Sequence, residues 1–205
     1  MRFTAFHRLA ALAGAFSALA GCSDKPSDSD IQAALAGQLD GQACLTAPMF
    51  RNFPVTLSDS FSGPGPASGN APAFDALVSA GLLTKNGASY DLTDAGRAAH
   101  QVGSQGFCYA DGFEIAEVKD VSEAKGQQGP AVDQAWDVTL DIRQKPVADW
   151  AKSPAVKQLS RDPDVFTQKV HTYHVTVATV KGEKGLRLID PRFSLNHGVS
   201  VSQGF

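Results

Sequence analysis

Histidines are the first candidates for metal or acid–base chemistry in this 205-residue chain. His171 and His174 lie three positions apart in a run of β-type residues, so a strand would point their side chains to opposite faces. They could hold one metal ion only across a bulge, and His100 and His197 have no such neighbour in the sequence. Zinc needs three or four ligands within reach, and neither Cys-x-x-Cys nor His-Glu-x-x-His occurs. We predict no metal site and no cofactor.

Carboxylates and serines give equally weak catalytic signals. Asp137 and Asp141 share one side of a predicted strand, but four strand residues span about 13 Å. A glycosidase pair needs about 5–9.5 Å between its carboxyl groups, so a solvated strand face explains these aspartates better. No Gly-x-Ser-x-Gly nucleophile motif is present. We predict that the chain has no catalytic residues.

Aromatic residues and overall charge bear on ligand binding. Trp136, Trp150 and Tyr173 could line a groove, although aromatics at the starts of strands and helices more often pack in a core. The Gly/Pro-rich stretch from Gly63 contains prolines, which lack the N–H groups that cradle phosphate. The formal net charge of −3 argues against a protein that binds nucleic acid by neutralising phosphates, so we predict no nucleic-acid partner.

The N-terminus has the pattern of an export signal. Arg2, His7 and Arg8 make a positive start, and Leu9 to Ala20 is an uncharged run of 12 residues, mostly Ala and Leu. A helix that crosses the bilayer needs about 20 residues, so this run is too short for a stable span and fits the apolar region of a secretory signal peptide. A soluble N-terminal helix is the alternative, but nothing polar gives it a second face.

The end of this run resembles the lipobox of bacterial lipoproteins. All four positions of Leu19-Ala20-Gly21-Cys22 match that pattern. The resemblance implies a signal peptide over residues 1–21, cleavage before Cys22, and diacylglycerol on the Cys22 thiol. In many bacteria it also implies acylation, such as palmitoylation, of the new amino terminus. Stable membrane anchoring takes more than one acyl chain, which this modification supplies.

The same resemblance implies a location. In Gram-negative lipoproteins an Asp directly after the lipidated cysteine tends to retain the protein at the inner membrane. Ser23 stands there instead, and Asp24 comes one position too late. The chain is therefore expected in the cell envelope, on the outer membrane facing the periplasm if the source is Gram-negative. Its partners would be the membrane, through the lipid, and an envelope protein or the cell wall.

If Cys22 carries lipid, two cysteines remain in a chain exported to an oxidising compartment. Cys44 and Cys108 then form the available intramolecular disulfide. A buried thiol, a reactive thiol and half of a metal site are the other interpretations. A catalytic cysteine needs a histidine and an electropositive setting, and the sequence shows neither.

The first elements that would position these residues are helical. Residues 22–29 form a polar tether, and the apolar stripe of Ile31, Leu35 and Leu39 predicts a helix over 30–39, capped by Asp28 or Ser29. Residues 61–72 are rich in Gly, Pro and Ser and predict a surface loop. A helix begins at Pro72 and ends at Gly81.

A segment of about 30 residues after this loop resembles the end of a winged-helix domain. It comprises a helix ending in Gly81-Leu82-Leu83, a hairpin turning at Asn86-Gly87, and Leu92-Thr93-Asp94-Ala95-Gly96-Arg97, where Thr93 caps the next helix. Two features depart from DNA-binding members of that family. The preceding Gly/Pro loop is not a recognition helix, and the hairpin holds one Lys and no Arg. The resemblance therefore concerns shape and not DNA binding.

From Gly106 the chain changes to β character. Residues 107–109, 113–118, 136–143, 170–180 and 186–189 are predicted strands, and 136–143 alternates apolar and polar residues as in a sheet with one wet face. Residues 146–159 predict one helix or two short ones that cross this sheet.

These observations predict an α+β fold in two parts. Residues 30–105 form a small helical part with a winged-helix-like hairpin, and 106–205 form an antiparallel sheet with one crossing helix. The expected function is that of a membrane-anchored envelope lipoprotein that acts as a non-enzymatic binding or accessory module. An envelope hydrolase with a scattered site is the alternative. A winged-helix DNA regulator would require that Cys22 is not the processed N-terminus.

Overall fold

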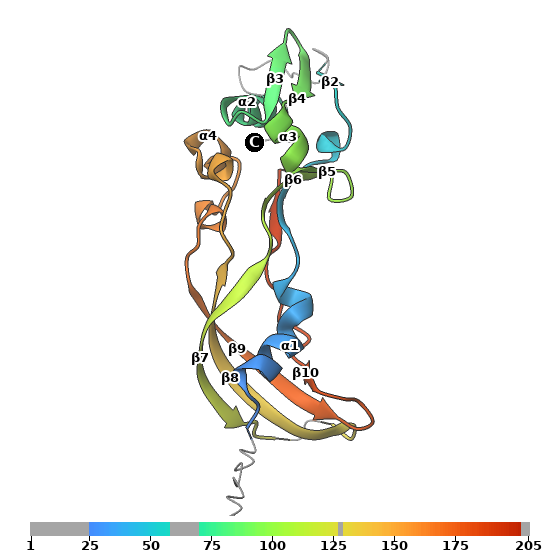
Figure 1. The fold of residues 1–205 in the computed structure, drawn as a ribbon, viewed down its shortest axis with the longest axis vertical. Coiled ribbons are helices and arrows are strands. Elements are labelled where there is room, and N and C mark those ends of the chain that lie inside the picture. Colours follow the sequence, from blue (N-terminus) through green and yellow to red (C-terminus); the bar gives the residue numbers. More distant parts are fainter. Residues whose placement is uncertain (1–24, 58–69, 127–128, 202–205) are drawn as a thin grey trace, which may run out of the picture.

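The computed structural model describes residues 25–57, 70–126 and 129–201. Within these ranges the chain is an elongated α+β molecule, which confirms the predicted class (Figure 1). A curved sheet occupies one end, a small helical unit with a hairpin occupies the other, and a narrow sheet lies between them. The predicted signal peptide, Cys22 and most of the Gly/Pro-rich stretch lie outside the described residues.

The curved sheet is built from long antiparallel strands. Its order is β10-β9-β8-β7, with bounds β7 (Phe113–Glu123), β8 (Val132–Gln144), β9 (His171–Val180) and β10 (Leu186–Leu188). Alternate residues of β8 are buried, including Val138, Leu140 and Ile142, as the period of two predicts. β7 and β8 are longer than the predicted strands 113–118 and 136–143, because the polar residues at their ends face water and still pair with the neighbouring strand.

Helix α1 (Asp28–Leu39) covers the apolar face of this sheet. Ser27, and not Asp28 or Ser29, is its N-cap: the Ser27 hydroxyl accepts from the Asp30 N–H, and the Asp30 carboxylate accepts from the Ser27 N–H. The predicted stripe of Ile31, Leu35 and Leu39 is fully buried against the sheet. This packing joins α1 to residues of the second predicted part, while the expected division near residue 105 stays a prediction.

The narrow middle sheet links the two ends of the molecule. Its order is β11-β1-β6-β5, with β1 (Ala43–Thr46), β5 (His100–Gln101), β6 (Gly106–Ala110) and β11 (Gly198–Ser200). β1 and β6 are antiparallel, and Cys44 lies opposite Cys108. The two sulfur atoms form a disulfide, which confirms the predicted pairing.

The unit at the far end has the expected hairpin and helices, and we call residues 48–101 the wing unit. It contains the turn η1 (Pro48–Phe50), α2 (Ala71–Ser79), α3 (Asp94–Ala99) and a sheet of order β2-β4-β3, with β2 (Val55–Thr56), β3 (Leu83–Asn86) and β4 (Ser89–Leu92). The Thr93 hydroxyl caps α3 by accepting from the Gly96 N–H at 2.9 Å, as predicted. Gly96 is required because a Cβ there would lie 2.0 Å from the Leu82 carbonyl oxygen.

Residues 146–159 depart from the prediction. They form short turns, η3 (Asp149–Lys152) and α4 (Pro154–Lys157), followed by η4 (Pro163–Phe166), and they do not cross the curved sheet. Ala151, Val156 and Phe166 instead pack into the core of the wing unit, and α4 contacts α2 (Figure 1). Pro154 and Pro163 interrupt the segment, so each turn is too short to span a sheet.

Two separate cores result from this arrangement. The wing-side core contains Phe50, Phe74 and Phe107, and the sheet-side core contains Leu140 and Val177. Several segments of the chain connect the two cores, among them Gly112 between β6 and β7, and we call the region of these connections the waist. Gly112 turns β6 into β7 there with φ +98°, and a Cβ would lie 2.2 Å from the Leu39 carbonyl oxygen, so this position requires glycine.

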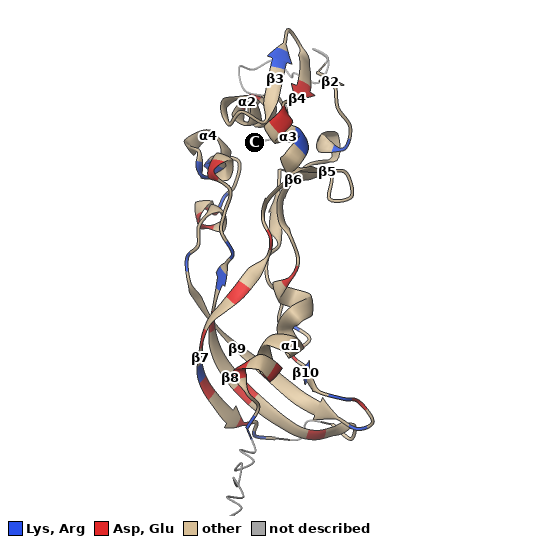
Figure 2. Ribbon diagram, in the orientation of Figure 1, with Lys and Arg blue, Asp and Glu red and all other residues tan. Residues whose placement is uncertain are grey.

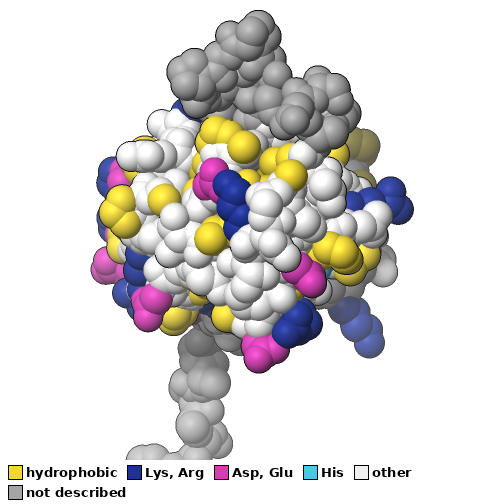
Figure 3. Space-filling view, turned by 90° about the horizontal axis from the view of Figure 1, so that it is seen from above, with side chains coloured by type: hydrophobic (Ala, Val, Ile, Leu, Met, Phe, Trp, Pro, Cys, Tyr) yellow, Lys and Arg dark blue, Asp and Glu magenta, His cyan; other side chains and the backbone are white. Residues whose placement is uncertain are grey.

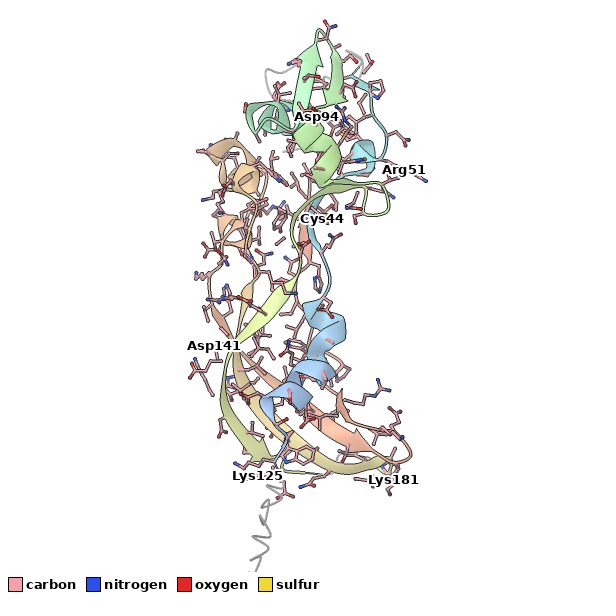
Figure 4. The ribbon with its side chains drawn as sticks, in the orientation of Figure 1. Cys44, Arg51, Asp94, Lys125, Asp141 and Lys181 are labelled. Carbon is pink, nitrogen blue, oxygen red and sulfur yellow. A yellow bond between two sulfur atoms is a disulfide. The ribbon has the colours of Figure 1, made fainter. Side chains whose placement is uncertain are left out.

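The disulfide closes the loop that contains the whole wing unit, at the base where Cys44 is labelled in Figure 4. Its 64-residue separation predicts that the double variant Cys44→Ser/Cys108→Ser loses about 2–4 kcal/mol of unfolding free energy. Urea denaturation of both proteins measures this loss, and reduction of the wild type by dithiothreitol should reproduce it. Equal midpoints for the variant and the oxidised wild type would contradict the prediction.

Candidate binding cleft

Two adjoining hollows open at the waist on the side of residues 159–171. The first encloses about 180 Å³ between the curved sheet and η4. The second encloses about 390 Å³ between residues 159–162 and β11. They share Asp162, Val165 and Asn196, so we treat them as one waist cleft. Both cores contribute to its walls, since Ile142 and Tyr173 belong to the sheet-side core and Leu159 and Val165 to the wing-side core.

Most charged groups in the first hollow are already paired. The Arg143 Nε donates to Glu114 at 2.6 Å, and the Lys169 Nζ donates to Asp164 at 2.5 Å. The Lys169 ammonium lowers the pKa of Asp164, and Asp164 in turn raises the pKa of Lys169. These side chains are about half exposed, so each pair contributes little to folding stability. They hold the shape of the mouth and leave little free charge there.

A buried amide fastens the cleft wall to the sheet. Gln144 is 6% exposed, and in the orientation that satisfies its amide, Nε2 donates to the carbonyl oxygens of Val165 at 2.8 Å and Thr167 at 3.2 Å. The amide oxygen then faces donors, and the buried hydroxyl of Tyr109 is the group that needs this acceptor. Burial raises the pKa of Tyr109 to about 12, against an opposing effect of Gln144. The end of β8 thereby positions η4.

The second hollow is bordered by the edge of β11 that pairs with no other strand in the part of the chain that the structure describes. β11 pairs with β1 in parallel, with Gly198 opposite Cys44 and Ser200 opposite Thr46. The Cys44 N–H donates to the His197 carbonyl, and the Val201 N–H donates to the Thr46 carbonyl. Because a parallel ladder uses alternate residues of each strand, the backbone groups of Gly198 and Ser200 point away from β1, toward the cleft.

The histidines weighed as metal ligands do not come together. His171 lines the first hollow, whereas His174 lies on the opposite face of β9 and bonds Thr139 through Nδ1 at 3.0 Å. His100 bonds the Phe50 carbonyl oxygen at 2.5 Å, and His197 bonds the Gly41 carbonyl oxygen at 2.8 Å. Over residues 25–57, 70–126 and 129–201 no group of three or more His, Cys, Asp or Glu side chains is placed to hold a metal ion.

The two aspartates of β8 lie on its polar face. Asp137 accepts from the Thr176 hydroxyl at 2.9 Å, and Asp141 accepts from the Thr172 hydroxyl at 2.6 Å and from Lys119 at 2.8 Å. The hydrogen bond and charge of Lys119 lower the pKa of Asp141. These are cross-strand pairs along a solvated face, and neither aspartate borders a hollow described above.

Of the three aromatics considered for a groove, Tyr173 lines the waist cleft. Its ring packs at right angles to Phe193 at 5.7 Å, and burial raises its pKa. Trp136 is buried in the sheet-side core, and Trp150 packs edge-on to Tyr109 beside the wing-side core. Both tryptophans therefore pack in or against the cores, as aromatic residues at the starts of strands and helices more often do.

Comparison with protein-family models, curated proteins and solved structures finds no match to this chain. Among the described residues, no helix has both the length and the apolar character needed to span a membrane.

Sequence reasoning missed the cleft. Its wall residues Gln144, Arg161 and Asn196 come from three distant segments and carry no motif. The one local signal was the pair of prolines that breaks residues 154–163 into turns. These turns fold back onto the wing-side core and leave a hollow beside the sheet.

Proposed function

We propose that this chain is a lipid-anchored binding module of a bacterial cell envelope, held at a membrane by Cys22 and acting without catalysis. The observation that carries the proposal is Leu19-Ala20-Gly21-Cys22 at the end of a short apolar run behind a positive start. The Cys44–Cys108 disulfide supports it, because disulfides persist in oxidising compartments such as the periplasm. The waist cleft is the surface that we propose for binding.

The position of the first described residues supports an orientation of this module. Lys25 donates from Nζ to the Val121 carbonyl oxygen at 2.6 Å, and it precedes α1 at the end of the curved sheet (Figure 1). Lys125 and Lys181 lie at the same end (Figure 4). Cys22 is three residues before Lys25, which limits their separation to about 11 Å. A lipid on Cys22 would hold the sheet end near the membrane and direct the wing unit and the cleft outward.

Photo-cross-linking in envelopes tests the binding role. A photoreactive residue at Asn196, in the cleft, should give a discrete cross-linked product, and one at Glu117, exposed on β7, should not. The purified chain should show no turnover of cell-wall or peptide substrates. Identical products from both positions would contradict a cleft partner. Turnover that stops when one acid or base is replaced, with the fold intact, would establish the hydrolase instead.

We also propose that the wing unit does not bind DNA. Phe74 to His100 contains Lys85 and Arg97 as its basic residues, against three aspartates. Lys85 is paired with Asp75 at 2.8 Å, and Arg97 is paired with Asp94. Specific DNA binding relies on several Lys or Arg contacts to phosphates. Figures 2 and 3 show acidic and basic residues interspersed over the described part of this end.

A gel shift with mixed-sequence duplex at low salt is the corresponding measurement, because low salt favours even weak electrostatic binding. We expect no retardation at micromolar protein. Retardation that disappears on addition of salt would contradict the expectation and would bring export itself into question.

A further inference from the structure

We propose that the free edge of β11 is a peptide-docking strand, and that an extended segment of an envelope partner adds to it within the waist cleft. The inference rests on the proposed binding function and names the class of partner and the recognition mode. In such strand addition the main-chain hydrogen bonds supply affinity and the neighbouring side-chain pockets supply selectivity.

The backbone of β11 presents the required groups. Gly198 and Ser200 alternate along β11 with the residues whose backbone groups bond β1. Their N–H and C=O groups therefore point toward the cleft. The Gly198 N–H is used locally, since it donates to the Asn196 Oδ1 at 3.2 Å. The Gly198 carbonyl and both backbone groups of Ser200 face the open edge of the sheet. Three residues of extended chain, about 10 Å, would match this edge.

The space beside the edge fits an added strand. The second hollow, of about 390 Å³, lies directly along Gly198, Val199 and Ser200. Its far wall is residues 159–162 with Val165, and this wall is fixed in place because Gln144 bonds the Val165 carbonyl and Leu159 is buried. An extended segment would therefore enter a preformed slot, which reduces the ordering cost of binding.

β7 and β3, two longer edge strands of the described chain, carry features that discourage pairing, whereas the protective feature of β11 is its length of only three residues. β7 has two register shifts, between Ile115 and Glu117 and between Val118 and Asp120, and it carries Lys119. β3 carries Lys85. Bulges and edge lysines are the usual devices that block strand addition. The sequence Gly-Val-Ser of β11 has no charge, no proline and no bulge.

Charge in the slot indicates one feature of the peptide. Arg161 lines the second hollow and forms no ion pair among the described residues, unlike Arg143 and Lys169 in the first hollow. Leu159 and Val165 add apolar surface beside it. Asp162 lines the same hollow, and its Oδ1 accepts from the Asp164 N–H at 3.0 Å. An extended peptide that alternates β-branched residues with a carboxylate placed at Arg161 complements this lining.

The test uses the full lipidated chain in detergent and a fluorescein-labelled hexapeptide, Thr-Val-Glu-Val-Thr-Val. Fluorescence anisotropy should show saturable binding below about 1 mM. The variant Ser200→Pro removes one backbone donor of the edge and should weaken binding by about tenfold, while Ser200→Ala keeps the donor and should bind as wild type. Arg161→Gln should weaken binding about two- to fivefold, and the peptide with Gln in place of Glu should not respond to that change.

A second measurement does not depend on how well the proline variant folds. Methylation of every backbone nitrogen of the peptide should abolish binding to the wild-type chain. Methylation of alternate nitrogens should preserve it, because one peptide edge remains free to pair. Equal binding of all three peptides, no binding of the parent peptide, or sedimentation as a dimer whose assembly Ser200→Pro abolishes would overturn the proposal. If Asn196 still cross-links to a partner in envelopes, the binding function stands without the strand addition.

Discussion

Replacement of Cys22 by alanine is expected to abolish acyl labelling of the chain and to release it from the membrane fraction. The thiol is the acceptor for diacylglycerol in the lipoprotein family whose junction this sequence resembles, and alanine offers no nucleophile. Each buried methylene of an acyl chain contributes about 0.8 kcal/mol, so loss of two or three chains removes tens of kcal/mol of membrane affinity. The effect is therefore all or none.

Metabolic labelling with a fatty-acid probe, followed by fractionation, measures both outcomes. Ser23→Ala is the matched control, because it alters the adjacent position and keeps the thiol. We expect full labelling of the control and none of Cys22→Ala. Comparable labelling of the two variants would show that the lipid is absent from Cys22.

The variant Phe107→Ala is expected to cost about 3–5 kcal/mol of unfolding free energy. Phe107 is fully buried on β6, in the middle of the wing-side core. Its ring contacts those of Phe50, Phe53 and His100, with centroids 5.5, 5.8 and 5.3 Å apart. Alanine would leave a cavity that these rings cannot fill without breaking the His100 bond to the Phe50 carbonyl.

Urea unfolding with a fixed m-value gives the free energy directly. Val102→Ala is the control, since Val102 is 63% exposed in the neighbouring loop, and its change should stay within about 0.5 kcal/mol. A loss below about 1 kcal/mol for Phe107→Ala would mean that the wing-side core is not packed as described.

Local patterns in the sequence predicted the elements that depend on local physics. The stripe of Ile31, Leu35 and Leu39 gave helix α1, the alternation along β8 gave its buried face, and Thr93 gave the cap of α3. In each case the signal lies within a few neighbouring residues, so it can be recognised without the rest of the chain.

The arrangement of these elements depends on contacts between distant residues. The stripe of α1 indicated that it packs on an apolar surface, but not that this surface is the curved sheet, whose first strand begins only at Phe113. The apolar residues of 146–159 are compatible with a helix over the sheet and also with turns packed on the wing-side core. The structure has the second arrangement, in which α4 packs against α2. The cysteine pair was predictable because the lipobox resemblance left two cysteines.

The waist cleft also depends on contacts between distant residues. The edge of β11 is created by its pairing with β1, which joins residues 44–46 to 198–200. The opposite wall depends on one buried amide, Gln144, in an otherwise apolar alternation. A polar residue at the end of a predicted strand is usually exposed to solvent, so the sequence alone does not indicate that Gln144 is buried and bonds the backbone of η4.

The intact mass of the chain extracted from membranes of its native host shows whether Cys22 is the lipidated N-terminus. We expect a polypeptide that begins at residue 22, carries diacylglycerol with or without a further acyl chain, and retains the Cys44–Cys108 disulfide until it is reduced. Recovery of residues 1–205 as an unmodified chain with three free thiols would contradict it.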